Sequence, residues 1–137
     1  MRRVTADSNI YISALNFGGK PLQVLELARA GEIELAISNA IITETSRILH
    51  HKFYWKPEDV TDAVEQILCF TKYLHADYTL DVVPIDPDDN RVLECALKAG
   101  SDTLVTGDTD LLVMGSFRGI KIQKPSDFLA EFQAKEP

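Results

Sequence analysis

Short apolar segments along this chain alternate with longer segments in which apolar residues recur every three or four positions. The short segments are typical of buried strands, and the longer ones of helices that bury one face. The pattern predicts strands at 3–6, 34–38, 103–106 and 120–123. It predicts helices at 21–30, 40–50, 57–76, 86–100, 110–114 and 126–132. Strands that alternate with helices are usually joined by right-handed crossovers, so we expect a three-layer α/β/α fold with a mostly parallel central sheet.

Three segment boundaries carry specific signals. Asn39 can cap the helix that follows it, and Asp86 followed by Pro87 is typical of another helix start. Segment 81–85 is extended but contains Pro84, which favours an edge strand or a loop over a central strand.

The size and composition of the chain are ordinary for a globular protein. Its 137 residues are 45% hydrophobic and 26% charged, so residues 1–137 are expected to form a single domain. Asp7 and Asn9 interrupt the apolar stretch near the N-terminus, which is unlike a signal peptide, and no stretch approaches the ~20 apolar residues of a membrane span. We therefore expect a cytoplasmic protein. Cys69 and Cys95 lie in apolar helical patterns without a CxxC spacing, so both are expected to be buried free thiols.

Two carboxylates stand out by their position in the pattern. Asp7 directly follows the first predicted strand, where it could cap a helix or project into a site at the edge of the sheet. Glu44 lies three residues after Ile41 and four before Ile48, within the apolar stripe of its helix. A buried carboxylate is costly unless it is paired or bound to a metal, so Glu44 favours a site. The alternative is a residue at the edge of the stripe that reaches solvent or a nearby arginine.

Asp89 repeats this argument at the start of the helix predicted at 86–100. Val92 and Leu93 follow it at the third and fourth positions, which places Asp89 at the head of the buried face. Its neighbours Asp86 and Asp88 have a sufficient structural explanation, as the helix cap and as an acid favoured by the helix dipole. We therefore set both aside.

Two further acids follow the strand predicted at 103–106. Asp108 and Asp110 come after Thr106 and Gly107, and the glycine lets the chain turn sharply or approach a ligand closely. Asp108 could simply cap the short helix that follows. Two acids at the end of a buried strand nevertheless favour a site.

Acids from four separate segments repel one another unless a cation joins them. Without cysteine or histidine partners, oxygen ligands favour Mg²⁺ or Mn²⁺ over zinc. Mg²⁺ is commonly completed by a substrate phosphate, which suits phosphoryl chemistry. The net charge of −7 argues against a simple nucleic-acid binder, but less so if several acids are metal ligands.

The motifs, taken together, resemble those of the PIN-domain family, and most closely its toxins of toxin–antitoxin systems. They occur in the family's order and span nearly the whole chain. The motifs are VTADSNIYISAL, SNAIITETSRIL, PIDPDDNRVLECA, LVTGDTDLL and KPSDFL.

The resemblance implies an Mg²⁺- or Mn²⁺-dependent endoribonuclease in which metal-bound water attacks an RNA phosphodiester in line, leaving a 5′-phosphate and a 3′-hydroxyl. It also implies a homodimer and a cognate antitoxin protein. The family's catalytic, metal-binding acids match Asp7, Glu44, Asp89 and Asp108. Asp89 is preferred to Asp88 because the family's acid stands three residues before an aliphatic residue, here Val92.

Three other residues match positions that accompany these acids in the family. Asp110 corresponds to a frequent additional metal ligand, and Asn9 and Thr106 to polar residues that support the site.

One local basic cluster, RILHHKFYWK, is a candidate for holding RNA. Arg47 and Lys52 are the substrate-binding candidates, and the interleaved aromatic residues could stack on bases. The alternative is a solvated helix end whose aromatic residues anchor the core or a dimer contact, and for the aromatics this is preferred. His50 and His51 are unfavourable as a metal pair, because adjacent residues of a helix face different directions.

Two rival enzyme or signalling folds fit less well. A haloacid-dehalogenase-type phosphatase needs a second acid two residues after the first, where this chain has Asn9. A receiver domain needs paired acids and a late lysine that are not evident. The serious alternative is a PIN-like RNA- or protein-binding module with little or no catalysis.

Overall fold

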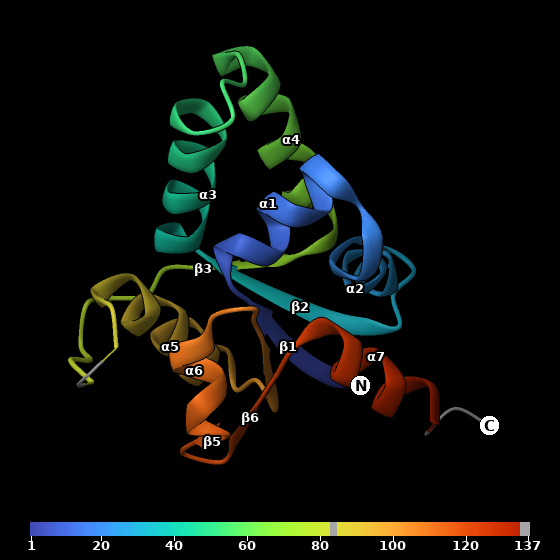
Figure 1. Ribbon diagram of the computed structural model, residues 1–137, viewed down its shortest axis with the longest axis vertical. Coiled ribbons are helices and arrows are strands. Elements are labelled where there is room, and N and C mark those ends of the chain that lie inside the picture. Colours follow the sequence, from blue (N-terminus) through green and yellow to red (C-terminus); the bar gives the residue numbers. More distant parts are fainter. Residues whose placement is uncertain (83–84, 135–137) are drawn as a thin grey trace.

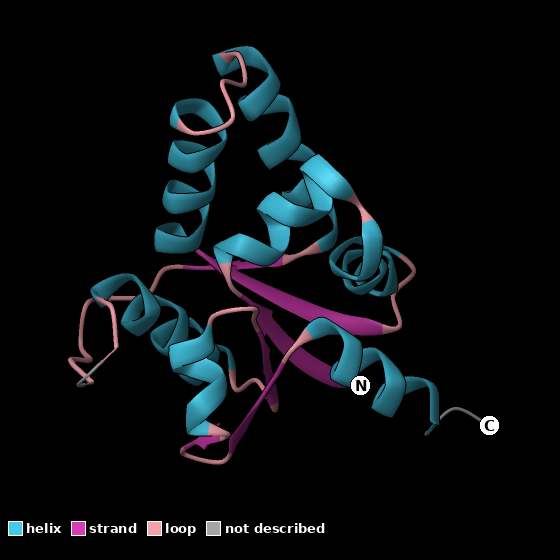
Figure 2. Ribbon diagram, in the orientation of Figure 1, coloured by secondary structure: helices cyan, strands magenta, loops and turns pink. Residues whose placement is uncertain are grey.

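A six-stranded sheet forms the centre of the molecule (Figures 1 and 2). The computed structural model describes residues 1–82 and 85–134. Within them, the strand order is β3-β2-β1-β4-β6-β5, all neighbours are parallel except β5 and β6, and helices flank the sheet. The strands are β1 (Arg2–Ala6), β2 (Ile33–Ser38), β3 (Lys72–Leu74), β4 (Thr103–Val105), β5 (Ser116–Phe117) and β6 (Ile120–Gln123). The predicted α/β fold with a mostly parallel sheet is confirmed.

Helices cover both faces of this sheet (Figure 1). They are α1 (Ser8–Phe17), α2 (Gly19–Arg29), α3 (Asn39–His51), α4 (Pro57–Phe70), α5 (Pro87–Ala99), α6 (Thr109–Met114) and α7 (Pro125–Ala134). Helix α5 packs against β1, β2 and β4, whereas α2 contacts β2 and also α7. The central strands are buried on both faces, as parallel strands between helical layers must be. None of the described helices is long and apolar enough to cross a membrane.

The region between β1 and α2 holds a helix that the apolar pattern did not predict. Helix α1 begins at Ser8, and the side chain of Asp7 caps it by accepting a hydrogen bond from the backbone N–H of Ile10. Most of its first turns are buried, so its apolar residues form an almost continuous run in which no helical period stands out. The N-terminal cap at Asp7 was the available signal.

The predicted helix at 57–76 was too long. Helix α4 ends at Phe70, and Lys72–Leu74 form the edge strand β3, which pairs in parallel with Ala36–Ser38 of β2. The hydrogen-bonding partners of this strand lie more than thirty residues away, so a local pattern cannot reveal them. The predicted segment 81–85 lies partly outside the described residues, and Asp81 and Val82 have no regular structure.

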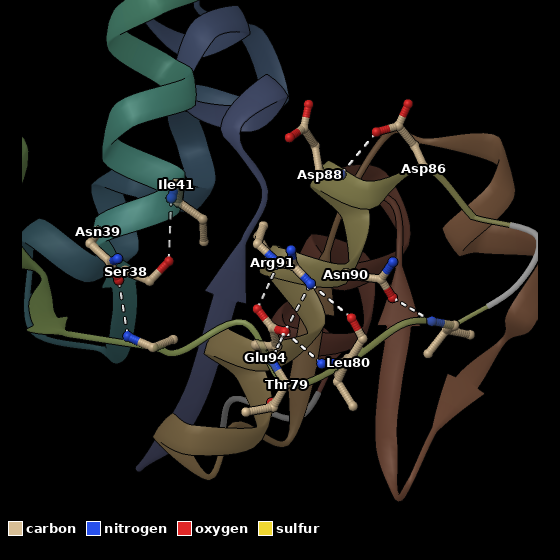
Figure 3. Close-up of polar contacts among 12 residues, drawn as sticks. Ser38, Asn39, Ile41, Thr79, Leu80, Asp86, Asp88, Asn90, Arg91 and Glu94 are labelled. Carbon is tan, nitrogen blue, oxygen red and sulfur yellow. Dashed lines mark hydrogen bonds and ion pairs between the residues drawn. The ribbon is translucent and has the colours of Figure 1, made fainter.

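Two smaller predictions were also wrong. Ser38, not Asn39, caps α3 by accepting a hydrogen bond from the N–H of Ile41, whereas the Asn39 side chain accepts one from the N–H of Ala76 at 2.9 Å (Figure 3). Cys95 is a buried free thiol as expected, but Cys69 is exposed. Cys69 lies two residues past Ile67, the last buried residue of α4, and two residues along a helix is more than half a turn.

Candidate functional site

The carboxyl ends of β1 and β4 bring the first acids together. These strands are parallel neighbours with Ala6 opposite Val105, so the residues that follow them leave the sheet side by side. The backbone N–H of Asp7 donates to the carbonyl of Val105 at 3.2 Å, which fixes Asp7 at this edge. Open parallel sheets commonly place their sites beyond this end of the strands.

Thr106 links the two strand ends through its hydroxyl group. That hydroxyl donates to Oδ2 of Asp7 and accepts a hydrogen bond from the backbone N–H of Asp108 at 2.9 Å. The other carboxylate oxygen of Asp7 accepts from Ile10 N–H at 3.1 Å, and Asp7 is only 3% exposed. Asp7 is therefore both a helix cap and a carboxylate fixed at the sheet edge, so the two alternatives drawn from the sequence are not exclusive.

Three further acids approach from α5 and α6. Carboxylate oxygens of Asp89, Asp108 and Asp110, one from each, all lie within 4.8 Å of one another. Asp108 also caps α6, accepting from the N–H of Asp110 at 2.8 Å and of Leu111 at 3.3 Å. The cap turns the Asp108 side chain back over the start of α6, and that leaves it beside Asp89.

Glu44 reaches the same region from α3, but not from the buried stripe that the sequence suggested. The buried residues of α3 are Ile41, Thr45 and Leu49, and Glu44 is half-buried at the edge of this stripe. The spacing of apolar residues predicted that Glu44 lies within the buried stripe. In the structure the stripe is centred near Thr45, and because a helix turns about 100° per residue, Glu44 lies at its edge. Its carboxylate interacts with the side chains of Ser8 and Arg47.

All five predicted acids line one pocket of about 200 Å³. The lining residues are Asp7, Ser8, Asn9, Glu44, Asp86, Asp88, Asp89, Val92, Asp108 and Asp110. Asp86 does cap α5, accepting from the N–H of Asp88 at 2.9 Å, as predicted. Both residues nevertheless also line the pocket. They are therefore further candidates for the site, although the sequence analysis set them aside. Figure 3 shows their carboxylates together at the start of α5.

Ser8 was missed altogether. It is a buried serine that lines the pocket and hydrogen-bonds to Glu44, and the only signal in the sequence was its place directly after Asp7. A hollow of about 540 Å³ also lies beside α4, lined by residues that include Leu15, Trp55 and Asp59. We take the smaller pocket as the candidate site because charged groups converge there, whereas the larger hollow is mainly apolar and open.

The convergence of these acids is electrostatically costly. Burial, and after it the negative charges of Asp108 and Asp7, raise the pKa of Asp89 to about 7. Burial likewise raises the pKa of Asp7 to about 6 against the hydrogen bonds that it accepts. Burial and the charge of Asp88 raise the pKa of Glu44. The pocket thus holds carboxyl groups whose ionised forms need a compensating positive charge.

A hard divalent cation fits this donor set. Oδ2 of Asp89 is buried and has no hydrogen-bond partner among the described residues, although Asp89 is only 8% exposed. A buried carboxylate oxygen without a partner is costly, and a cation would remove that cost. The other donors around it are also carboxylate oxygens, which favour Mg²⁺ or Mn²⁺ over softer metals.

A buried ion pair holds the segment that leads into α5 (Figure 3). Oε1 of Glu94 lies 2.8 Å from Nε of Arg91, and Oε2 accepts from the N–H groups of Thr79 at 2.6 Å and Leu80 at 2.7 Å. Arg91 in turn donates to the carbonyl of Leu80 at 2.8 Å. These contacts tie residues 79–80 to the helix that carries Asp86, Asp88 and Asp89.

Of the other predicted site residues, Asn9 lines the pocket, whereas Arg47 and Lys52 do not. Asn9 is exposed at its lining, and Arg47 is exposed on α3. Lys52 follows α3, with Nζ 5.9 Å from the centre of the Phe53 ring. Phe53 and Trp55 pack against the small core cluster around Leu49, as preferred for the aromatics, although Tyr54 is 85% exposed.

Solved structures share this fold at low sequence identity. PAE2754 from Pyrobaculum aerophilum superposes with a TM-score of 0.63 at 20% identity, covering 98% of this chain and 91% of its own. VapBC2 from Rickettsia felis, bound to a DNA fragment from their promoter, gives 0.62 at 15% identity, covering 89% of this chain and 98% of that one. Mycobacterium tuberculosis VapC20, a Sarcin-Ricin loop cleaving toxin, gives 0.61 at 14% identity, with coverages of 86% and 98%.

Sequence comparison identifies the family. Comparison with curated proteins found no match. The sequence pattern of the PIN domain matches residues 3–110, which is most of the chain and includes all five predicted acids. The resemblance seen in the motifs is thereby confirmed, and the chain belongs to the PIN-domain family.

Proposed function

We propose that this protein is an endoribonuclease that depends on Mg²⁺ or Mn²⁺ and acts as the toxin of a toxin–antitoxin pair. The observation that carries the proposal is the convergence of acids from four segments on one pocket around the unpartnered Oδ2 of Asp89. The likeness to VapC20, described as a Sarcin-Ricin loop cleaving toxin, supports RNA as the substrate. The proposal includes a cytoplasmic location, a homodimer and a cognate antitoxin protein.

In this proposal Asp7, Glu44, Asp89 and Asp108 hold the cation, with Asp110 as an additional ligand. When bound, a divalent cation neutralises charge on the phosphate and lowers the pKa of water so that it can attack. The chain's own contribution is to keep Asp7 oriented through Thr106 and Ile10, so that its carboxylate does not have to reorganise during the reaction.

Cleavage of RNA by the purified protein tests the proposal. The wild type is expected to cleave with Mn²⁺ and to stop when EDTA is added. Asp7→Asn is expected to lower the rate by about a hundredfold, because metal ligands and their supports typically matter at this scale. Asparagine caps helices as well as aspartate does, so the start of α1 is preserved. Gel analysis of a labelled RNA measures the rate.

Asp62→Asn is the matched control, since Asp62 is an exposed acid of α4 outside the acidic pocket. It should cleave like the wild type. If Asp7→Asn also cleaves RNA like the wild type, the assignment of the catalytic site to this pocket is wrong. If the wild type binds RNA without cleaving it under any metal condition, the protein is a binding module and the proposed enzyme activity is wrong.

Mn²⁺ is expected to raise the melting temperature of the wild type, because a ligand that binds only the folded state stabilises it. The double variant Asp7→Asn/Asp108→Asn should show little or no shift, since two ligands from neighbouring strand ends are lost. Differential scanning calorimetry with and without MnCl₂ measures both proteins. An equal shift in the two would place the bound metal outside this pocket.

A further inference from the structure

Helix α3 carries a row of side chains that extends from the acidic pocket toward its C-terminal end. Glu44, Arg47 and His51 are spaced by three and four residues, so they lie on one face of the helix. The buried face, with Ile41 and Thr45, is turned away from this row. Helix α3 leads away from the sheet at the end of β2, so the row leads outward from the pocket (Figure 1).

Arg47 lies close enough to Glu44 to act on its carboxylate. Its guanidinium lowers the pKa of Glu44, against the larger effect of burial, although Arg47 itself is exposed. The described residues that line the pocket include no lysine, arginine or histidine. A phosphodiester entering the pocket from this side would therefore meet Arg47 first.

The other basic residues of the same segment are placed differently. His50 is held at the helix end, where Nδ1 lies 2.9 Å from the carbonyl oxygen of Trp55. Lys52 lies about 80° around the helix axis from Glu44, close to the buried face, and its ammonium group lies against the Phe53 ring. His51 is exposed and lies only about 20° from Glu44 on the same projection.

We propose that Arg47 and His51 form a backbone-binding track that holds phosphates of a single-stranded RNA on one side of the scissile bond. The inference rests on the proposed ribonuclease function and assigns how that site binds its substrate. The row spans roughly 10 Å from Glu44 to His51, since each helical residue advances about 1.5 Å. That length accommodates a few nucleotides. A single strand can bend from the track into the small pocket between the helices, whereas a stiff duplex cannot.

Kinetics of cleavage of a labelled single-stranded RNA with Mn²⁺ test the track. Arg47→Ala is expected to raise KM about five- to tenfold and to leave kcat within about twofold, and His51→Ala to raise KM about two- to fivefold. The dependence of log KM on log salt should become less steep by about 0.7 for each phosphate that the variant no longer binds. Lys52→Ala should have a smaller effect than either. Lys20→Ala, an exposed lysine of α2, is the matched control and should behave as the wild type.

Three results would overturn the track. A fall in kcat with unchanged KM would mean that Arg47 acts through Glu44. Equal increases in KM for Arg47→Ala, Lys52→Ala and Lys20→Ala would mean that RNA is attracted by the general positive charge of the protein and not by a defined track. Duplex RNA cleaved as well as single strands would refute the strand preference. Fluorescence anisotropy with the same variants measures RNA binding directly. If the wild type binds RNA without cleaving it, the proposed enzyme fails, and the binding losses still decide the track.

Discussion

Replacing Asp89 with asparagine is expected to stabilise the metal-free protein at neutral pH while reducing RNA cleavage by about a hundredfold or more. The two effects have opposite signs because the ionised carboxylate destabilises the folded protein when no cation is bound, but is a ligand when a cation is present. Oδ2 of Asp89 has no hydrogen-bond partner among the described residues, so asparagine gives up no hydrogen bond there. Sites that gather like charges for function commonly show this exchange between stability and activity.

The pH dependence of stability isolates the electrostatic part of this effect. The folded protein raises the pKa of Asp89 to about 7, whereas an unfolded chain has a value near 4. Between these values the unfolded state has released the proton and the folded state keeps it, so stability falls as pH rises from about 4 to about 7. Asp7, with a pKa of about 6, contributes in the same direction. Asp89→Asn removes its own share, on the order of 4 kcal/mol at pH 7.5, and about none below pH 4.

Urea unfolding in EDTA at about pH 4 and pH 7.5 measures this difference. Asp62→Asn, the exposed acid of α4, controls for the general loss of one negative charge. A variant that is less stable than the wild type at both pH values would show that the Asp89 carboxylate makes favourable contacts in the folded state. The cost assigned to the acidic pocket would then be wrong.

Glu94→Ala is expected to destabilise the protein by about 3 kcal/mol, or roughly 10 °C in Tm. Glu94 is only 5% exposed, and its carboxylate is shared by Arg91 and two backbone N–H groups. Its removal leaves a partly buried guanidinium without its counter-ion and leaves backbone donors without an acceptor. Arg91 keeps only its contact with the carbonyl of Leu80 and its position 4.1 Å from the centre of the Tyr78 ring.

Glu26→Ala is the matched control. Glu26 and Arg29 form the same kind of pair three residues apart on a helix, at 3.2 Å, but both side chains are at least half exposed. Exposed pairs of this kind contribute about 0.5 kcal/mol or less. Chemical unfolding of both variants measures the difference, and similar losses for the two would mean that burial does not strengthen the Arg91–Glu94 contact.

Local sequence signals predicted the elements whose ends are marked within the chain. Helix α5 begins after the Asp86 cap with Pro87 at its first position and ends at Gly100, which adopts the left-handed conformation that glycine readily provides. The strands β1, β2, β4 and β6 were predicted because buried parallel strands are short apolar runs. Helix α1 was not predicted, because its apolar residues form an almost continuous run in which no helical period stands out.

The acids, too, divide into those that local sequence signals predicted and those that only the tertiary fold revealed. Asp7 and Asp108 could be chosen from the sequence because Asp7 directly follows β1 and Asp108 comes three residues after the end of β4, and parallel strands end at the same edge of a sheet. Whether Asp86 and Asp88 reach the pocket depended on how α5 packs beside α3, which no local pattern contains. The same holds for Ser8.

The sequence by itself thus determined where strands and helices alternate, the family, and which acids end the strands, because these follow from local periodicity and neighbouring residues. Only the tertiary structure decided that Glu44 lies at the stripe edge, that Asn39 binds the N–H of Ala76, and that residues 72–74 extend the sheet. Each depends on a partner distant in sequence. The tertiary fold also decided the electrostatics, since the raised pKa values of Asp7 and Asp89 arise from burial and from charges on other elements.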